Sequence, residues 1–461
     1  MSEIAIVILA AGKGTRMSLP FSKPLAPLQD KKLVDFPIKT LKAFTSKKKL
    51  DSNFSVVTGH DRENLESYLS SQYQGLHYSF QKDQNGTGGA LSSYLDQCDW
   101  AESQKYTLIA CADTPCLRVC DLERLYDVLV ENDAQAVAAS FHLDSPKGYG
   151  RIIRSKKGFQ IKEEKDASDE EKAITEVNSG LYIVKTTYLL EQINKVDTNN
   201  AAGEFYLTDI FKEDADVKPV LFENPLSFLG VNTAEQLQSA EAILRQQKIS
   251  ELTQQGVRFI DPSSVYIEDD VKVGKGTSIA PHCHLKGNTV LGQNVNLEAG
   301  AWIKDSEVGD GAAILSYSHL ESVVIKGAAS IGPFARLRPG TLIEEDVKIG
   351  NFVETKKAHF HKGAKASHLS YVGDAEIGEE SNLGCGFITC NYDGKNKHKT
   401  TIGKRTFIGS DTQVVAPVKV GDDCFIACGS TITQNMDSGS FAVSRGRQET
   451  KPGMAKRFLK K

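Results

Sequence analysis

A glycine-rich segment near the N-terminus has residue types suited to binding phosphate. It reads Leu9-Ala10-Ala11-Gly12-Lys13-Gly14-Thr15-Arg16-Met17, and Lys23 follows it. Glycine lets backbone N–H groups approach phosphate oxygens closely, and Arg16 and Lys23 would supply positive charge against a polyphosphate. A lone G-x-G is weak evidence, but the apolar run from Ile4 indicates a strand that ends at this segment. We therefore interpret the segment as a phosphate-binding loop rather than a plain turn.

Short β-rich runs alternate with amphipathic stretches from Ile4 to about Asn232 and would position this loop. The runs include 4–10, 54–58 and 107–110, and the stretches include 33–44, 62–69 and 121–130. This alternation predicts an α/β domain over 1–232, with a mostly parallel, Rossmann-like sheet that binds ligands at the carboxyl ends of its strands. The capping-box pattern Thr233-Ala234-Glu235-Gln236 predicts a linker helix over 233–254.

The second half carries an aliphatic residue at every sixth position, as at Ile267, Val273, Ile279, Leu285, Leu291, Leu297 and Ile303. A period of six fits neither an α-helix nor a heptad. It fits short strands joined by tight turns, each placing one aliphatic side chain inside a parallel β-helix. We predict this coil over 255–440, followed by a tail over 441–461. The register breaks near Ser306, between Lys356 and Asp374, and between Cys390 and Thr400, which predicts loops that leave the coil there.

Composition excludes several classes of function. Of the 461 residues, 40% are hydrophobic and 25% are charged, and the length suits a globular chain of two or three domains. The net charge of -4 provides no excess of positive charge for binding nucleic acid. No apolar stretch is long enough to span a bilayer and the N-terminus lacks a basic leader, so we predict a cytoplasmic protein. The nine cysteines form no CxxC pair, which predicts reduced thiols, and Cys116 and Cys120 lack further ligands for zinc.

The segment L-x-x-G-x-G-T-R-M, with a lysine six residues after the methionine, resembles the signature of sugar-nucleotide pyrophosphorylases. Further matches follow in the same order along the chain: Gln81 with Gly86-Thr87-Gly88, Asp113, Gly148-Tyr149-Gly150-Arg151, Glu163, Asn178-Ser179-Gly180 and Gly230-Val231-Asn232. Two positions depart from the family pattern. Ser22-Lys23-Pro24 stands where the family usually reads Pro-Lys, and Cys111-Ala112 stands where it has a bulkier aromatic residue and a glycine.

This resemblance implies a site for uridylyl transfer from UTP, with release of pyrophosphate. Lys23 and Arg16 would be catalytic, and Asp113 and Asn232 would hold Mg²⁺, a hard cation that prefers oxygen ligands. Gln81 and Thr87 would read the uracil edge, and Gly150, Glu163 and Asn178 would hold an acetamido sugar. The remaining nucleotide-binding residues would be Leu9, Ala10, Ala11, Gly12 and Gly86.

Four segments of the second half contain specific polar and charged residues that a simple hexapeptide repeat does not require. They are Gly332 to Gly340, Asn351 to Lys357, His368 to Asp374 and Cys390-Asn391-Tyr392-Asp393-Gly394. With the first half, they resemble the bacterial bifunctional N-acetylglucosamine-1-phosphate uridyltransferase/glucosamine-1-phosphate N-acetyltransferase family over nearly the whole chain. The resemblance implies a left-handed β-helix, a homotrimer with acetyl sites shared between chains, and sugar phosphates, UTP and acetyl-CoA as substrates.

Acetylation of an amino sugar needs a base that removes a proton from the amine. An isolated histidine is more often structural, but His368 lies in an off-register segment among cations and polar groups. By resemblance Glu354 and Asn391 would orient His368, while Arg338 and Lys356 would bind the sugar phosphate and Tyr371 and Asn382 the sugar. Tyr392 and Ser410 would lie near the thioester, and Lys397 would reach in from its loop. The acetyl-CoA site would comprise Cys385, Asn391, Tyr392, Ser410, Cys428 and Arg445.

Two other functions stay open at this point. One is a nucleotidyltransferase whose solenoid only oligomerises or regulates, and the other is a catalytically silent scaffold with a nucleotide-binding sensor domain. The first would not need the residues between Lys356 and Tyr392, and the second would not need Lys23, Asp113 and Asn232.

Overall fold

A computed structural model describes residues 3–12, 14, 17, 21–156, 158–213 and 215–459 of the chain. The contacts divide it into two compact units, Met1–Leu244 and Arg245–Lys461. Helix α7 (Ala234–Gln254) contains the boundary between them. At the start of this helix Thr233 Oγ1 accepts from Gln236 N, and Gln236 Oε1 accepts from Asn232 N at 2.7 Å. The cap therefore also fixes the backbone of Asn232.

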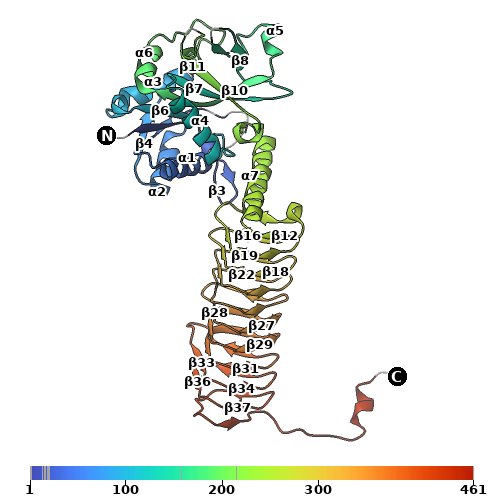
Figure 1. Cartoon of the computed structure of the whole chain (residues 1–461). Helices are drawn as coiled ribbons and strands as arrows, with labels where there is room; N and C mark the ends of the chain where they lie inside the picture. The colour runs from blue at the N-terminus through green and yellow to red at the C-terminus, as the bar shows by residue number, and fades with distance from the viewer. Residues whose placement is uncertain are drawn as a thin grey trace. The chain divides into compact units, whose positions relative to one another are not determined.

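The first unit is built on one large sheet (Figure 1). Its strands lie in the order β11 (Val217–Phe222), β7 (Ala136–His142), β10 (Glu176–Lys185), β6 (Tyr106–Cys111), β1 (Ile4–Leu9), β4 (Ser52–Thr58) and β5 (Leu76–Phe80). Only β10 runs antiparallel to its neighbours on this path. A hairpin of β8 (Arg151–Arg154) and β9 (Phe159–Lys162) is attached to β10. The predicted parallel-sheet domain is confirmed.

Helices bury both faces of this sheet. Strand β1 shows why, since Ile4, Ile6 and Ile8 belong to one apolar cluster and Ala5 and Val7 to another. Side chains of α1 (Asp35–Lys48), α2 (Arg62–Gln72) and α4 (Val119–Glu131) join the first cluster, and those of α3 (Thr87–Gln97) and α6 (Thr186–Ile193) join the second. A strand covered on both faces must be continuously apolar, which explains the run from Ile4.

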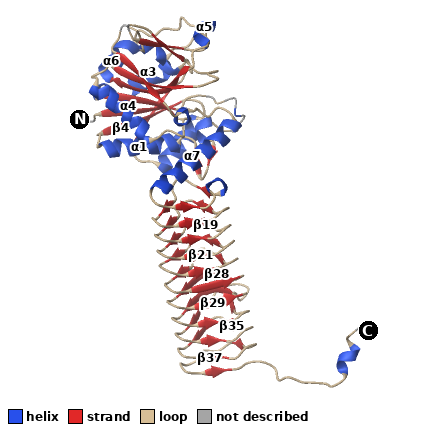
Figure 2. Ribbon diagram, turned by 45° about the vertical axis from the view of Figure 1, so that its right-hand side comes forward, coloured by secondary structure: helices blue, strands red, loops and turns tan. Residues whose placement is uncertain are grey.

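The second unit is a parallel β-helix of stacked short strands (Figures 1 and 2). Residues one coil apart pair in register, as Ile267 with Leu285 and Ile279 with Leu297, so a coil here is 18 residues, or three hexapeptides. These aliphatic side chains are buried inside the coil. The predicted hexapeptide solenoid is confirmed.

Part of the predicted acetyl-transfer site lies on one face of the β-helix. Five successive strands of this face are β27 (Lys348–Asn351), β29 (Lys365–His368), β31 (Asn382–Leu383), β34 (Phe407–Ile408) and β37 (Phe425–Ile426). We call this face the first column. The strands β25 (Arg336–Leu337), β28 (Glu354–Phe360), β30 (Tyr371–Ile377) and β32 (Ile388–Cys390) form a second column. The seven-residue strands β28 and β30 continue past a corner to pair with β26 (Leu342–Ile343) and β33 (Thr400–Ile402).

Two of the three predicted loops are wrong. Near Ser306 and between Lys356 and Asp374 the chain stays in the coil, and Leu291 pairs with Val308 and Ile349 with Ala366, each 17 residues on. Removing one residue at a corner shifts the hexapeptide register without any excursion. The third loop is confirmed, because Ala375 pairs with Thr400, 25 residues on, and the extra residues follow β32.

Within the part of the chain that the structure describes, no helix is both long and apolar enough to cross a bilayer.

Candidate functional site

A cavity of about 530 Å³ opens at the carboxyl ends of β1 and β6 in the first unit. It is lined by Leu9, Ala10, Ala11, Gly12, Lys23, Pro24, Gln81, Gln84, Gly86, Thr87, Ala90, Cys111, Ala112, Asp113 and Glu204. Nine of the predicted residues thus meet in one place, where parallel sheets bind ligands. Among the described residues other than its chain neighbours, none has an atom within 4 Å of the place where a Cβ on Gly12 would stand, so this backbone is open to a ligand on that side. The predicted catalytic Arg16 lies outside the described residues.

The ammonium group of Lys23 lies between the two predicted metal ligands. It forms an ion pair with Asp113 Oδ2 and donates to Asn232 Oδ1 at 3.1 Å. The two oxygens therefore converge on one position that already holds a positive charge. A carboxylate and an amide oxygen suit Mg²⁺, which takes few protein ligands together with phosphate oxygens. The residues present fit this ion, provided that Lys23 turns toward the phosphates when the metal binds.

Two local features hold Lys23 in place. Gly14 has a φ of 61°, and a Cβ there would lie 2.6 Å from the Cβ of Lys23, so only glycine fits beneath the lysine. Before it, the backbone N–H of Ser22 donates to Asp61 Oδ2 at 2.8 Å. Burial would raise the pKa of Asp61, but this bond and one from Asn64 bring it below its ordinary value. A proline at position 22, as in the family pattern, has no N–H and could not make this bond to Asp61.

Gln81 and Thr87 support the rim of the cavity. The amide nitrogen of Gln81 donates to Asn85 Oδ1 at 3.1 Å and to the Gly86 carbonyl at 3.0 Å, so both of its N–H groups are used inside the protein. Thr87 Oγ1 accepts from the backbone N–H of Leu207. The side-chain carbonyl oxygen of Gln81 would therefore be the atom that binds the uracil edge in the predicted role.

Three predicted sugar contacts lie together but do not line the cavity: Gly150 immediately precedes β8, Glu163 immediately follows β9 and Asn178 is on β10. Asn178 N donates to the Gly150 carbonyl at 2.9 Å, and a Cβ on Gly150 would stand 3.5 Å from the Glu163 carboxylate. Burial, opposed by a bond from Thr208, raises the pKa of Glu163. Nearby, burial raises the pKa of the Cys111 thiol to about 12, so this replacement for an aromatic residue stays neutral.

A cluster of cations lies at the second column of the β-helix and on the loop that follows β32. The register pairs Leu337 with Thr355, which places Arg338 beside Lys356. Glu354 Oε1 accepts from Arg338 Nη1 at 2.8 Å. Repulsion from Lys397, and then from Arg338, lowers the pKa of Lys356. We call these three residues the cation cluster: Arg338, Lys356 and Lys397. A bound phosphate would offset the repulsion between their positive charges.

His368 ends β29 on the first column and its side chain is exposed. Its Nδ1 lies 2.8 Å from Asn351 Oδ1. Because an amide oxygen only accepts, Nδ1 carries the hydrogen, and Nε2 is left to take a proton. The two residues predicted to orient His368 have other partners in the single chain, Arg338 for Glu354 and Asp374 for Asn391. Sequence reasoning missed Asn351, although it lies one 17-residue coil before His368.

We expect Asn351→Ala to lower kcat of the predicted acetyl transfer about tenfold without changing KM, because Asn351 would act only by positioning the ring of His368. Asn351→Asp keeps an acceptor for Nδ1–H and should restore most of the rate. Steady-state kinetics of both variants checks this. An Asp variant as slow as the Ala variant would show that the bond has no positioning role.

The predicted acetyl-CoA residues continue the column that His368 begins. Ala366 pairs with Leu383, Leu383 with Ile408 and Ile408 with Ile426. Two residues beyond each of these positions stand His368, Cys385, Ser410 and Cys428, one above another. Arg445 lies next to Cys428. Its Nη1 donates to the Cys428 carbonyl oxygen at 2.7 Å and lies 3.1 Å from the Cys428 sulfur.

The remaining predicted residues occupy other positions. Asn382 lies on β31, and Tyr371 lies at the start of β30, on the second column. Asn391 is buried, whereas Tyr392 is exposed on the loop after β32 and donates to the Gly394 carbonyl.

The comparisons with known proteins cover both units. A MobA-like NTP transferase domain matches residues 6–255, and a bacterial transferase hexapeptide model of six repeats matches 399–434. Full-length relatives carry the name bifunctional protein GlmU. The protein from Trichlorobacter lovleyi is 41% identical over 98% of this chain and 98% of its own length. Those from Geotalea uraniireducens and Staphylococcus haemolyticus are each 40% identical over 98% of this chain and 99% of their own.

Proposed function

This chain belongs to the family of bifunctional GlmU proteins, and from that premise we propose how its two units divide the work. It is a uridylyltransferase and an N-acetyltransferase. The β-helix transfers the acetyl group of acetyl-CoA to glucosamine-1-phosphate. The first unit then transfers a uridylyl group from UTP to the resulting N-acetylglucosamine-1-phosphate, giving UDP-N-acetylglucosamine and pyrophosphate.

In acetyl transfer, the cation cluster binds the sugar phosphate and holds the amine against the thioester carbonyl. The amine attacks this carbon, Nε2 of His368 takes the proton, and the C–S bond breaks. The proton then passes to the leaving thiolate, which gives free coenzyme A. Asn351 Oδ1 accepts the hydrogen bond from Nδ1–H of His368 throughout. The ring can therefore hold the proton taken from the amine on Nε2 until the thiolate accepts it.

In uridylyl transfer, an oxygen of the sugar phosphate attacks the α-phosphorus of UTP while the bond to the leaving pyrophosphate breaks. Lys23 and the backbone at Gly12 hold the phosphates in line, since charge neutralisation and positioning provide most of the catalysis. Mg²⁺ held by Asp113 and Asn232 would neutralise charge on the phosphates. Gly150, Glu163 and Asn178 would hold the acetamido sugar.

The observation that carries the proposal is that each unit holds its own group of chemically suited residues. Lys23, Asp113 and Asn232 meet at the cavity of the first unit, and His368 stands on the β-helix with Asn351 behind it. A solenoid that only oligomerises does not account for His368 or for the cation cluster.

The same proposal includes a homotrimer formed through the β-helix. Tyr317, Phe334 and Phe352 stack at one corner with ring centroids 5.4 and 5.6 Å apart, although about half of each side chain is exposed. An exposed aromatic column of this kind is suited to burial against another copy.

The experiment that tests the function incubates the full chain with glucosamine-1-phosphate, acetyl-CoA, UTP and Mg²⁺ and follows the products by mass spectrometry. We expect UDP-N-acetylglucosamine, coenzyme A and pyrophosphate. Without UTP the reaction should stop at N-acetylglucosamine-1-phosphate, and without acetyl-CoA no sugar nucleotide should form. Formation of UDP-glucosamine at a comparable rate would contradict the proposed order.

The cation cluster gives a further prediction. Lys356→Met should raise KM for glucosamine-1-phosphate about tenfold or more, because one charge-assisted bond to the phosphate is lost. The neighbouring Lys357→Met, on an exposed corner, is the matched control and should leave KM unchanged. An equal effect of both variants would contradict the assignment.

The pH dependence follows from the lowered pKa of Lys356. A lysine with a lowered pKa loses its charge at a lower pH than an ordinary lysine. The KM for glucosamine-1-phosphate should therefore rise as the pH approaches the pKa of Lys356. Lys397→Met removes the largest cause of the lowering and should move this rise to higher pH. Steady-state kinetics across alkaline pH checks the direction.

A further inference from the structure

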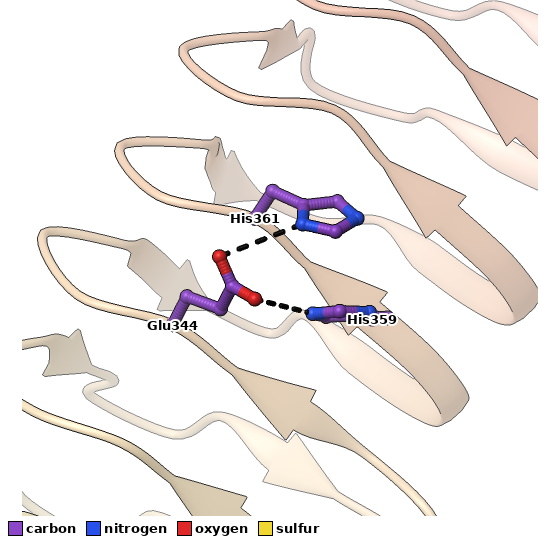
Figure 3. Close-up of side chains that lie close together, drawn as sticks. All are labelled: Glu344, His359 and His361. Carbon is purple, nitrogen blue, oxygen red and sulfur yellow. Dashed lines mark hydrogen bonds and ion pairs between the residues drawn. The ribbon is translucent and has the colours of Figure 1, made fainter.

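A second cluster of side chains suited to binding a metal lies on the β-helix (Figure 3). None of its three residues is among those assigned to either proposed active site. His359 is in β28 and His361 follows it, two residues on, so both project outward while Phe360 between them is buried inside. Their ring centroids are 3.9 Å apart. Glu344 stands on the coil before, because Leu342 pairs with His359 and Ile343 with Phe360.

The donor atoms of these three residues converge. Nε2 of His359 lies 2.9 Å from Glu344 Oε1, and Nδ1 of His361 lies 3.5 Å from Glu344 Oε2. One donor atom from each residue falls within 4.8 Å of the others. All three side chains are 24 to 30% exposed, so they are partly shielded yet open to solvent.

We propose that Glu344, His359 and His361 bind a divalent transition-metal ion of the Zn²⁺ type. Two imidazole nitrogens and one carboxylate form a three-ligand set that leaves a fourth, tetrahedral position for water. Imidazole also distinguishes this site from the oxygen ligands at Asp113 and Asn232, which suit Mg²⁺. The two sites therefore select different ions.

Glu376, on the next coil, supports this arrangement from outside. Its Oε1 lies 3.2 Å from Nε2 of His361, and its Oε2 accepts from Lys399 at 2.6 Å. With Nε2–H donated to Glu376, Nδ1 of His361 is left unprotonated and faces Glu344. A carboxylate behind a histidine ligand in this way fixes the ring and its tautomer.

A bound ion would join two successive coils directly and a third through Glu376. Strands β28 and β30 also carry Glu354, Lys356 and Tyr371, so the ion would brace the strands that hold part of the acetyl site. The ion would act by bracing these strands, since none of the residues assigned to acetyl transfer is among its proposed ligands.

The test is a titration of the metal-stripped full chain with Zn²⁺ by calorimetry, with Mg²⁺ in excess to fill the oxygen site. We expect one Zn²⁺ bound per chain and a higher melting temperature in its presence. Glu344→Gln and the double change His359→Asn/His361→Asn should abolish both effects. Glu376→Gln should weaken binding about tenfold, as loss of an outer carboxylate does.

Glu345→Gln is the matched control, since Glu345 is the next residue, is 61% exposed and carries the same charge. It should bind Zn²⁺ as the wild type does. Co²⁺ provides an independent measurement, because four-coordinate Co²⁺ gives strong visible absorption that Glu344→Gln should remove. Equal binding by the wild type and by Glu344→Gln, as cysteine thiols alone would give, overturns the proposal, as does wild-type protein that binds no Zn²⁺.

Discussion

Asp113→Ala is expected to lower uridylyl transfer by about 10³-fold or more, while acetyl transfer continues at the wild-type rate. Asp113 provides the only carboxylate of the proposed Mg²⁺ site, and in the structure it also pairs with Lys23. Its loss weakens binding of the ion that would neutralise the triphosphate and removes the ion-pair partner of Lys23. The measurement is pyrophosphate release from UTP with N-acetylglucosamine-1-phosphate, beside coenzyme A release from acetyl-CoA with glucosamine-1-phosphate.

Asp99→Ala is the matched control, because Asp99 is exposed in the same unit. It should keep both activities. Raising the Mg²⁺ concentration should restore little activity to Asp113→Ala. Uridylyl transfer within tenfold of the wild-type rate, or a parallel loss of acetyl transfer, would refute the role given to Asp113.

His368→Ala is expected to have the opposite effect. It should lower acetyl transfer by about 10²- to 10⁴-fold, the usual contribution of a general base. Uridylyl transfer from UTP to supplied N-acetylglucosamine-1-phosphate should be unchanged, since His368 is not among the residues that line the first cavity. The exposed His282, on an earlier coil, gives the control His282→Ala.

The loss in His368→Ala should lie in kcat rather than in KM, because the cation cluster still binds the sugar phosphate. A variant that keeps most of its acetyl transfer would mean that another group removes the amine proton. A variant that loses only affinity for glucosamine-1-phosphate would make His368 a binding residue.

The fold was largely predictable because both units have strong periodic signals. The six-residue period predicts the solenoid since each coil must place one aliphatic side chain per strand inside, as Ile267, Leu285 and Ile303 do. The same arithmetic could have found Asn351, one coil before His368. The continuous apolar run from Ile4 predicted a buried strand, and the structure buries this strand, β1, on both faces.

Contacts between distant residues were not predictable in this way. The bond from Ser22 to Asp61 joins residues 39 apart, and no local pattern marks Asp61 as the partner. The register shifts near Ser306 and after Lys356 were misread as loops, because a coil shortened by one residue and an excursion both interrupt the period. His359 and His361 carry no signal alone. Only the pairing of β26 with β28 brings Glu344 beside them.

The most direct test of the central claim, that two separate pockets share this chain, mixes two defective proteins. Asp113→Ala and His368→Ala are each incubated with glucosamine-1-phosphate, acetyl-CoA, UTP and Mg²⁺, first alone and then together. Alone, Asp113→Ala should accumulate N-acetylglucosamine-1-phosphate and His368→Ala should leave the sugar unchanged. Together they should produce UDP-N-acetylglucosamine, because the intermediate released by one protein is consumed by the other. A mixture as inactive as its components would contradict the account.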